Sequence, residues 1–245
     1  MMPKEHFMKR RNLFFLAGTI CFLWVVPSGS LAGVALDQVV RDQDGTPSKV
    51  LIYYSDHQFR ADHQEGGKST ILDYKEDRLF MIDHRSRNYV EVKLSVWEKE
   101  VAKKLKEDFP GVIPKERKIN VRRTGRTAVI NGFQTEEIQV WAERELIEEN
   151  WVTRDVDVKE VQQVMDRVAR GLSKDFRSDM KEGLEVHEKL KPFGFPILVK
   201  DYAITHGLGA IDRVEVKKME KRELKEDLFL PPPDYQKIIP KPSKK

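Results

Sequence analysis

The chain has 245 residues, with 44 Lys and Arg against 40 Asp and Glu, one cysteine and 40% hydrophobic residues. This length suffices for one medium-sized domain, and the nearly balanced charge excludes a strongly electrostatic nucleic-acid binder. The single cysteine excludes an intrachain disulfide and any cysteine-rich zinc module.

The first 32 residues have the three zones of a secretory signal peptide. A basic start is followed by the uncharged run 13–26 and by small residues at Ser30 and Ala32. As a helix this run rises only about 21 Å, less than the roughly 30 Å of a bilayer core, so cleavage is favoured over a membrane anchor. We expect cleavage after Ala32, or alternatively after Ala35. The mature chain is then nearly neutral, lacks Cys21 and suits a bacterial periplasm.

Between residues 34 and 92, short extended segments alternate with turn residues, which indicates an antiparallel meander. The connections are too short for the crossover helices of a parallel sheet. The expected strands are Val34–Asp42, Lys49–Ser55, Gln58–His63, Ser69–Tyr74, Arg78–Asp83 and Asn88–Val92.

Apolar residues spaced by three and four then predict a helix from Leu94 to Asp108, which ends at the turn Pro110-Gly111. Extended segments return after it, and Asn131-Gly132 is a strong hairpin signal. The expected strands are Lys118–Arg123, Thr127–Ile130, Phe133–Ala142 and Leu146–Arg154.

A second helical stretch begins at Asp157, with Glu160 in the capping-box position, and keeps helical spacing up to Pro192. Ile197–Thr205 and Ala210–Glu220 are expected to form a hairpin. The chain therefore divides into a signal peptide (1–32), one α+β domain (33–230) and a Pro/Lys-rich extended or disordered tail (231–245).

This order of segments resembles a group of bacterial periplasmic proteins related to outer-membrane lipoprotein carriers, the LolA/LolB-like superfamily. The resemblance implies a curved antiparallel half-barrel wrapped over a few helices, with an apolar cavity between them and no enzyme activity. Many relatives have a cysteine where this chain has Thr135. The matching stretches are Lys49–Arg60, Leu79–Asp83, Arg87–Tyr89, Ile130–Phe133, Glu149–Asp155, Gly194–Pro196 and Leu228–Pro231.

Two expected strands, at Val50–Tyr54 and Leu79–Ile82, are apolar on both faces and do not alternate. One face can cover helices, so the other meets a ligand, a partner or a second layer of the chain. Ordinary central strands with partly exposed tyrosines are the alternative. We expect the spare surface to bind acyl chains or another hydrophobic ligand. The candidate cavity-wall residues are Leu51, Tyr53, Phe80, Ile82, Trp97, Trp141 and Trp151.

The segment 115–126 is rich in Lys and Arg. In an exported protein, Arg122, Arg123 and Arg126 are candidates for contact with anionic lipid headgroups or another polyanionic envelope surface. A solvated strand with its turns is the alternative.

Three Asp-His pairs, Asp56-His57, Asp62-His63 and Asp83-His84, carry metal-ligand side chains. Successive turns of a meander lie at opposite ends of the sheet, so His57 cannot meet the other two, and only a site from His63 and His84 stays open. We expect ordinary turn residues and no metal.

We expect no catalytic residue and no cofactor, because the chain lacks a Gly-x-Ser-x-Gly elbow, a Gly-rich phosphate loop and a His-Glu-x-x-His helix. The expected function is a periplasmic binding or carrier-like protein. The alternative is an envelope interaction module that holds a protein partner through its sheet edge or helices. Neither nucleic-acid binding nor a stable transmembrane anchor after cleavage is expected.

Overall fold

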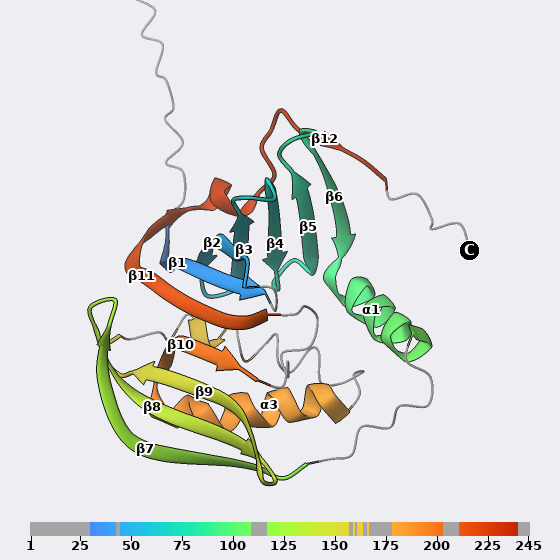
Figure 1. Cartoon of the computed structure of the whole chain (residues 1–245). Coiled ribbons are helices and arrows are strands. Elements are labelled where there is room, and N and C mark those ends of the chain that lie inside the picture. The colour runs from blue at the N-terminus through green and yellow to red at the C-terminus, as the bar shows by residue number, and fades with distance from the viewer. Residues whose placement is uncertain are drawn as a thin grey trace, which may run out of the picture.

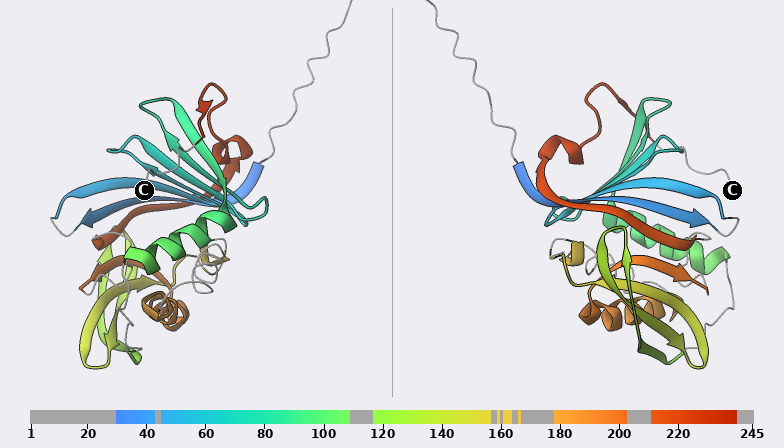
Figure 2. Two further views of the ribbon diagram at one scale, coloured as in Figure 1. Left: turned by 90° about the vertical axis from the view of Figure 1, so that its right-hand side faces the viewer. Right: turned by 60° about the vertical axis from the view of Figure 1, so that its left-hand side comes forward.

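One open, strongly curved sheet forms the framework of the molecule (Figures 1 and 2). The computed structural model describes residues 30–42, 45–108, 117–156, 178–202 and 211–239, together with residues 159, 161–163 and 166. The helices are α1 (Leu94–Asp108) and α3 (Ser178–Leu190), with short 3-10 turns η1 (Lys191–Phe193) and η2 (Glu226–Phe229). The strands are β1 (Ser30–Asp42), β2 (Pro47–Tyr54), β3 (Gln58–His63), β4 (Lys68–Asp73), β5 (Arg78–Asp83), β6 (Asn88–Lys93), β7 (Ile119–Ile130), β8 (Phe133–Ala142), β9 (Glu145–Thr153), β10 (Phe195–Asp201), β11 (Ile211–Lys225) and β12 (Gln236–Lys237).

The strand order in this 12-stranded sheet is β12-β6-β5-β4-β3-β2-β1-β11-β10-β9-β8-β7. The predicted meander is confirmed in β1–β6, where each strand pairs antiparallel with the next. Two of its turns are fixed by aspartates that end strands: Asp73 Oδ1 accepts from the backbone N–H of Glu76 at 3.0 Å, and Asp83 Oδ1 from that of Ser86 at 3.1 Å. Such side-chain bonds offer the backbone an alternative to the ladder, so the strand ends there.

The long strand β11 joins the two halves of the sheet by pairing with β1 on one edge and β10 on the other. This confirms the antiparallel pairing predicted for the last two extended segments. β1 approaches its neighbours closely at Gly33, where an added Cβ would lie 2.4 Å from both Leu224 Cδ1 and the Tyr54 carbonyl oxygen. Only glycine fits there without displacing backbone.

The concave face carries the main core. Val34 and Leu36 of β1 pack with Ile52 of β2, Ile197 of β10 and Val161 of the helical insert. On the β7–β10 half, α3 covers the same face and buries its Val186 against Ile119, Val140 and Ile147. Figure 1 shows α3 lying within the curve of the sheet. The expected curved sheet over a few helices is therefore confirmed.

The convex face of β3–β5 is covered by the end of the chain itself. Residues 226–239, which we call the C-terminal strap, bury Phe229 completely against Ile71, Phe80 and Ile82. β12 then pairs in parallel with β6. Residues 231–239 of the segment expected as an extended or disordered tail (231–245) are thus part of the folded layer, where Tyr235 packs against the cluster around Phe229. Residues 240–245 lie outside the described part.

Several expectations differ in detail or fall on other residues. β7 is one strand where two were expected, since a register shift between Arg123 and Thr127 absorbs the turn residues. The helix over Leu94–Asp108 is confirmed. Residues 1–29, much of the second helical stretch and the turn at 203–210 lie outside the described residues. Within the described ranges, no helix combines the length and apolar character needed to cross a membrane.

Candidate functional site

Two rows of side chains cross the concave face from β2 to β6. Residues that stand opposite each other in antiparallel strands point to the same face of a sheet, so the register defines these rows. One row is Tyr54, Phe59, Leu72, Leu79 and Val92. The other is Ile52, Ala61, Thr70, Met81 and Val90. Apart from Thr70, the residues of both rows are aliphatic or aromatic or, at Met81, carry a thioether.

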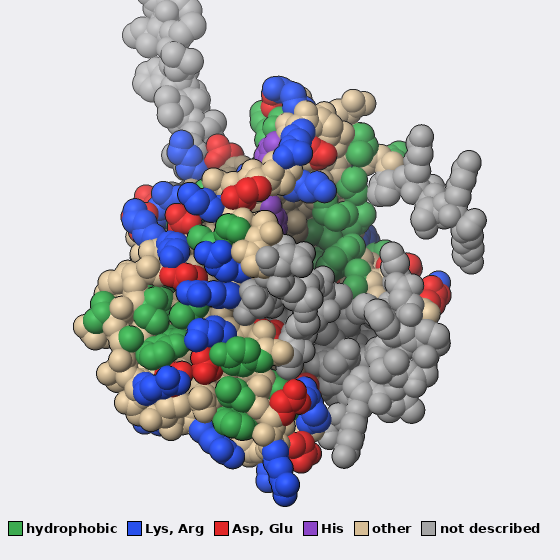
Figure 3. Space-filling model, viewed as in Figure 1, with side chains coloured by type: hydrophobic (Ala, Val, Ile, Leu, Met, Phe, Trp, Pro, Cys, Tyr) green, Lys and Arg blue, Asp and Glu red, His purple; other side chains and the backbone are tan. Residues whose placement is uncertain are grey.

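The rows run from the core to solvent. Tyr54 and Ile52 are 6% and 9% exposed within the core, whereas Met81 at the other end is 39% exposed. Leu72, Val90 and Val92 are half-buried around it. Figure 3 shows hydrophobic side chains gathered over β4–β6 on the face turned toward the viewer. We call Leu72, Met81, Val90 and Val92 the apolar strip. It offers a contiguous hydrocarbon surface to an apolar group.

The predicted cavity-wall residues do not form one wall. Phe80 and Ile82 point to the convex face, where they are 3% and 2% exposed beneath the strap. Leu51 and Tyr53 of β2 share that face, and the guanidinium of Arg222 lies 5.7 Å from the Tyr53 ring centroid. Trp97 is half-buried on α1. The binding role of these residues stays a prediction.

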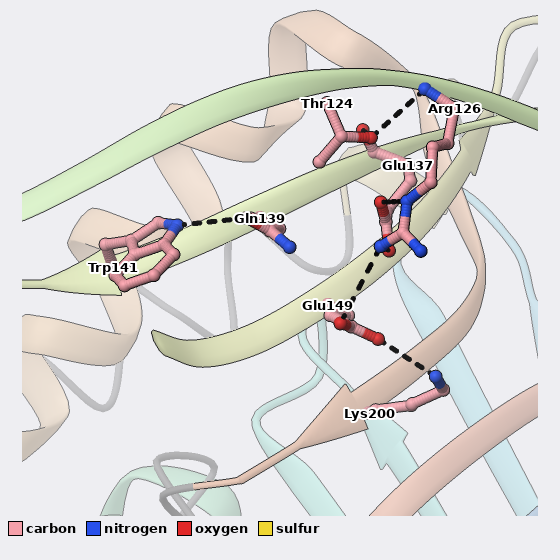
Figure 4. Close-up of polar contacts among 7 residues, drawn as sticks. All are labelled: Thr124, Arg126, Glu137, Gln139, Trp141, Glu149 and Lys200. Atoms are coloured by element: carbon pink, nitrogen blue, oxygen red, sulfur yellow. Dashed lines mark hydrogen bonds and ion pairs between the residues drawn. The ribbon is translucent and has the colours of Figure 1, made fainter. Parts of the chain in front are cut away.

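Trp141 and Trp151 instead meet two of the predicted arginines on the outer, convex face of β7–β9. The Arg122 guanidinium lies 4.8 Å from the Trp141 ring centroid, and that of Arg126 lies 5.9 Å from the Trp151 ring centroid. The indole Nε1 of Trp141 donates to Gln139 Oε1 at 3.2 Å, as Figure 4 shows. Two sets of residues predicted separately therefore form one surface, which we call the arginine–tryptophan face.

A chain of ion pairs fixes this face (Figure 4). Arg126 donates through Nε and Nη2 to the two carboxylate oxygens of Glu137, whose side chain is 0% exposed. Arg126 Nη2 also lies 3.9 Å from Glu149, to which Lys200 Nζ donates at 2.9 Å. The carboxylates therefore hold the Arg126 guanidinium beside Trp151.

These contacts shift the pKa values of two side chains of the face, Glu149 and Tyr202. Burial alone would raise the pKa of Glu149, but hydrogen bonds from Lys200 and Tyr202 and the charges of Lys200 and Arg126 outweigh it and lower that pKa. Burial and the bond to Glu149 raise the pKa of Tyr202 to about 12. Glu149 is therefore ionised and Tyr202 neutral at physiological pH.

The structure separates Arg123 from the other two arginines. Its guanidinium donates to both oxygens of Glu136, at 2.8 and 2.6 Å, and lies 5.7 Å from the Phe193 ring centroid. Hydrogen bonds and the charge of Glu136 raise its pKa. Among the described residues, Arg122 has no carboxylate partner, so it is the predicted arginine with an uncompensated charge.

Two of the three histidines of the Asp-His pairs, His57 and His84, contact protein groups. His84 Nε2 lies 2.6 Å from Ser69 Oγ, which donates to Asp62 Oδ1 at 2.5 Å, and His84 Nδ1 lies 3.1 Å from the Tyr235 hydroxyl. Both ring nitrogens therefore have protein partners: Nδ1 contacts Tyr235 of the strap and Nε2 contacts Ser69 of β4. His57 lies against its neighbour Asp56 at another turn.

One further cluster has metal-ligand side chains close together. Ligand atoms of Asp166, His187 and Glu188 lie within 4.8 Å of one another. The ammonium of Lys191 lies 2.6 Å from Asp166 Oδ2, and His187 Nε2 lies 3.1 Å from Asp166 Oδ1. A lysine on the shared carboxylate makes this an ion-pair cluster at the end of α3 and opposes a bound cation.

The residues of the apolar strip were missed as a set by sequence reasoning. The run Leu79–Ile82, which is apolar on both faces, did indicate a spare apolar surface. The sequence does not show which face of that run the strap covers, so Phe80 and Ile82 were selected in place of Met81.

Comparisons with known proteins give a family and distant structural likenesses. A family model described as a domain of unknown function, DUF4412, matches residues 40–235. A comparison with curated proteins finds no match.

Three solved structures illustrate the likeness. An uncharacterized conserved protein from Thermus thermophilus is 8% identical, with a TM-score of 0.45 over 84% of this chain and 89% of that one. A chain of the Pseudomonas aeruginosa MucA/MucB complex is 10% identical, with a TM-score of 0.42 over 84% of this chain and 57% of that one. This chain therefore spans little more than half of that one.

A LolA superfamily protein from Nitrosomonas europaea, of the superfamily predicted from the sequence, is 8% identical, with a TM-score of 0.29 over 83% of this chain and 90% of that one. These scores are low, so the fold class rests on the sheet order of this chain itself.

Proposed function

The chain belongs to the family described as a domain of unknown function, DUF4412, and we propose that it is a non-catalytic periplasmic protein that binds an apolar ligand on its apolar strip. One observation carries this proposal. Two apolar rows run from the buried core to Met81, which is 39% exposed, without an intervening charged residue. The opposite face of the same strands is already covered by the strap.

The chemistry of the strip favours a hydrocarbon ligand. Leu72, Met81, Val90 and Val92 offer no hydrogen-bond donor or strong acceptor from their side chains, so binding must come from removing apolar surface from water, at about 25 cal/mol per Å². From β4 to β6 the strip extends roughly 10 Å at the usual strand spacing. This span suits part of an acyl chain lying across the strands. Met81 adds a flexible thioether side chain that adapts to ligands of different shape.

A fluorescent-probe titration tests the proposal. The mature chain is titrated with a dansyl-labelled fatty acid and with N-phenylnaphthylamine. We expect saturable binding that Met81→Asp weakens at least about tenfold, because a carboxylate in the strip must be desolvated by the ligand. Val129→Asp is the matched control: Val129 is 62% exposed on β7 and lies outside the strip.

Two results would overturn the proposal. One is the absence of saturable binding by the wild-type chain. The other is an equal loss of affinity in Met81→Asp and Val129→Asp when circular dichroism shows both variants folded.

A second candidate function is protein binding at the edge strand β7. The sheet has two edges. At one edge β12 pairs with β6, and Ile238, which follows β12, donates its N–H to the Tyr89 carbonyl at 2.8 Å. β7 forms the other end and pairs with β8. An extended partner segment could add to that edge. A photo-crosslinking residue at position 127 would then capture a protein, whereas one at position 81 would not.

A further inference from the structure

The arginine–tryptophan face presents a positive charge that the fold does not neutralise. Arg122 is exposed and stacks on Trp141, and it has no carboxylate partner among the described residues. Its neighbour Arg126 is bound by Glu137, and Lys200 by Glu149. The strand itself, Ile119–Ile130, contains three arginines and no acidic residue. Charge complementarity therefore favours an anionic occupant.

The aromatic rings of the face indicate what kind of anionic occupant it fits. Trp141 and Trp151 are only partly buried on the convex face, where no described layer of the chain covers them. Figure 3 shows hydrophobic side chains interspersed with Lys and Arg side chains and with a smaller number of Asp and Glu side chains over this part of the molecule. Tryptophan prefers the boundary between lipid headgroups and acyl chains, while basic residues are attracted to anionic headgroups. An indole beside an unpaired guanidinium offers both contacts within one side-chain pair.

Hydrogen bonds within the protein also fix the side chains of this face. The Glu137 carboxylate fixes Arg126 beside Trp151, and Thr124 Oγ1 accepts from the Arg126 backbone N–H at 3.1 Å. Gln139 stands opposite both Arg122 and Glu149 in the register and accepts from the Trp141 indole. Side chains ordered in advance lose little conformational freedom on binding.

From these observations we propose that the arginine–tryptophan face docks the protein on the surface of an anionic lipid bilayer. Arg122 contacts headgroup phosphate, and the Trp141 and Trp151 indoles lie at headgroup level. This inference does not depend on the apolar strip, which lies on the concave face of β4–β6 in the other half of the sheet.

Vesicle co-sedimentation tests the proposal. The mature chain is mixed with vesicles of phosphatidylcholine containing phosphatidylglycerol, and with vesicles of phosphatidylcholine alone. We expect binding to the anionic vesicles only, and weaker binding as salt is raised. Arg122→Glu should weaken that binding roughly ten- to thirtyfold, since each basic residue near such a surface is worth a factor of about five.

Lys103→Glu is the matched control, because it makes the same change in net charge on α1, where Lys103 is 66% exposed. We expect it to bind like the wild type. Arg122→Gln, which adds no negative charge beside Glu149, provides a second variant if Arg122→Glu is unstable. In addition, the blue shift of tryptophan emission on vesicle binding should be reduced in Trp141→Phe, lost in the double variant Trp141→Phe/Trp151→Phe, and kept in Trp97→Phe.

Three results would overturn the proposal: equal weakening by Arg122→Glu and Lys103→Glu, equal binding to both kinds of vesicle, or binding to soluble heparin without binding to vesicles. The first would indicate a nonspecific effect of net charge. The last would assign the face to a soluble polyanion.

Discussion

Phe80 and Met81 are consecutive residues of β5, yet Phe80 is 3% exposed and Met81 is 39% exposed. Successive strand residues point to opposite faces, and the two faces of β5 meet different surroundings. On the convex side Phe80 packs with Phe229 of the strap. On the concave side Met81 lies beside Val90 at the open end of the apolar rows. The apolar run Leu79–Ile82 thus serves a second layer on one side and leaves a free surface on the other.

Phe229 should therefore be essential for holding the strap. Phe229→Ala removes a fully buried ring from the cluster with Ile71, Phe80 and Ile82. We expect a loss of about 3–5 kcal/mol in the free energy of unfolding, measured by urea denaturation. Leu230→Ala is the control, because Leu230 is 42% exposed and should cost less than about 0.5 kcal/mol. Similar losses in both variants would contradict the assigned role of Phe229.

Local patterns predicted the elements well, because each hairpin and helix is encoded within a short window. The helix Leu94–Asp108 and the strands Gln58–His63, Arg78–Asp83 and Phe133–Ala142 match their expected bounds. The long-range assembly was not predictable in this way. The strap is held by pairs such as His84 with Tyr235, 151 residues apart, and no periodicity near either residue encodes that contact.

In the candidate site too, the sequence predicted individual residues but not the long-range contacts between them. The sequence identified the arginines of β7 and the tryptophans of β8 and β9, but it assigned them to different ligands. Their meeting depends on the register that places Trp151 opposite Glu137, and on the local shift that brings Arg126 to that carboxylate. Register over several strands is a tertiary property.

Asp73 should make the stability of the meander depend on pH. Its side chain is 2% exposed and accepts hydrogen bonds from Gln58 Nε2 at 2.9 Å and from the backbone of Glu76 at 3.0 Å. Burial opposes ionisation, but these bonds and the Arg78 guanidinium outweigh it and lower the pKa of Asp73. The unfolded chain therefore binds the proton more readily, and the contribution of ionised Asp73 is present above pH about 4.

That contribution is lost as pH falls through the lowered pKa of the folded state. Asp73→Asn should cost about 1–3 kcal/mol at neutral pH, and the difference from the wild type should shrink below pH about 4. Urea denaturation of both chains across this pH range measures it. A difference that is constant with pH would contradict an ionised Asp73 in the folded state.

The position of the mature N-terminus should affect stability through Val34. Val34 is 0% exposed in the concave core and pairs with Tyr54 and Lys221. A chain that begins at Gly33 keeps this side chain, whereas one that begins at Leu36 lacks it. We expect the shorter chain to be less stable by at least about 1.5–3 kcal/mol. Thermal unfolding of the two chains makes the comparison, and equal midpoints would contradict it.

Two arginine–glutamate pairs of similar geometry should differ in their coupling energies. Arg126 with Glu137 and Arg123 with Glu136 are both two-point contacts, but Glu137 is 0% exposed and Glu136 is 26% exposed. Removing Arg126 leaves a carboxylate that was covered, although the 59% exposure of Arg126 means that water then reaches it. We expect a coupling of about 1–2 kcal/mol for this pair. For Arg123 and Glu136 we expect a smaller coupling, because solvent screens an exposed pair.

Double-mutant cycles with alanine at both positions, followed by urea denaturation, measure both couplings. Arg126→Met is a useful additional variant, because it keeps an aliphatic stem near Trp151 while removing the charge. If burial of the carboxylate controls the interaction, raising salt should reduce the coupling of the exposed pair more than that of the Arg126–Glu137 pair. Equal couplings with equal salt dependence would show that the burial of Glu137 adds nothing to its attraction for Arg126.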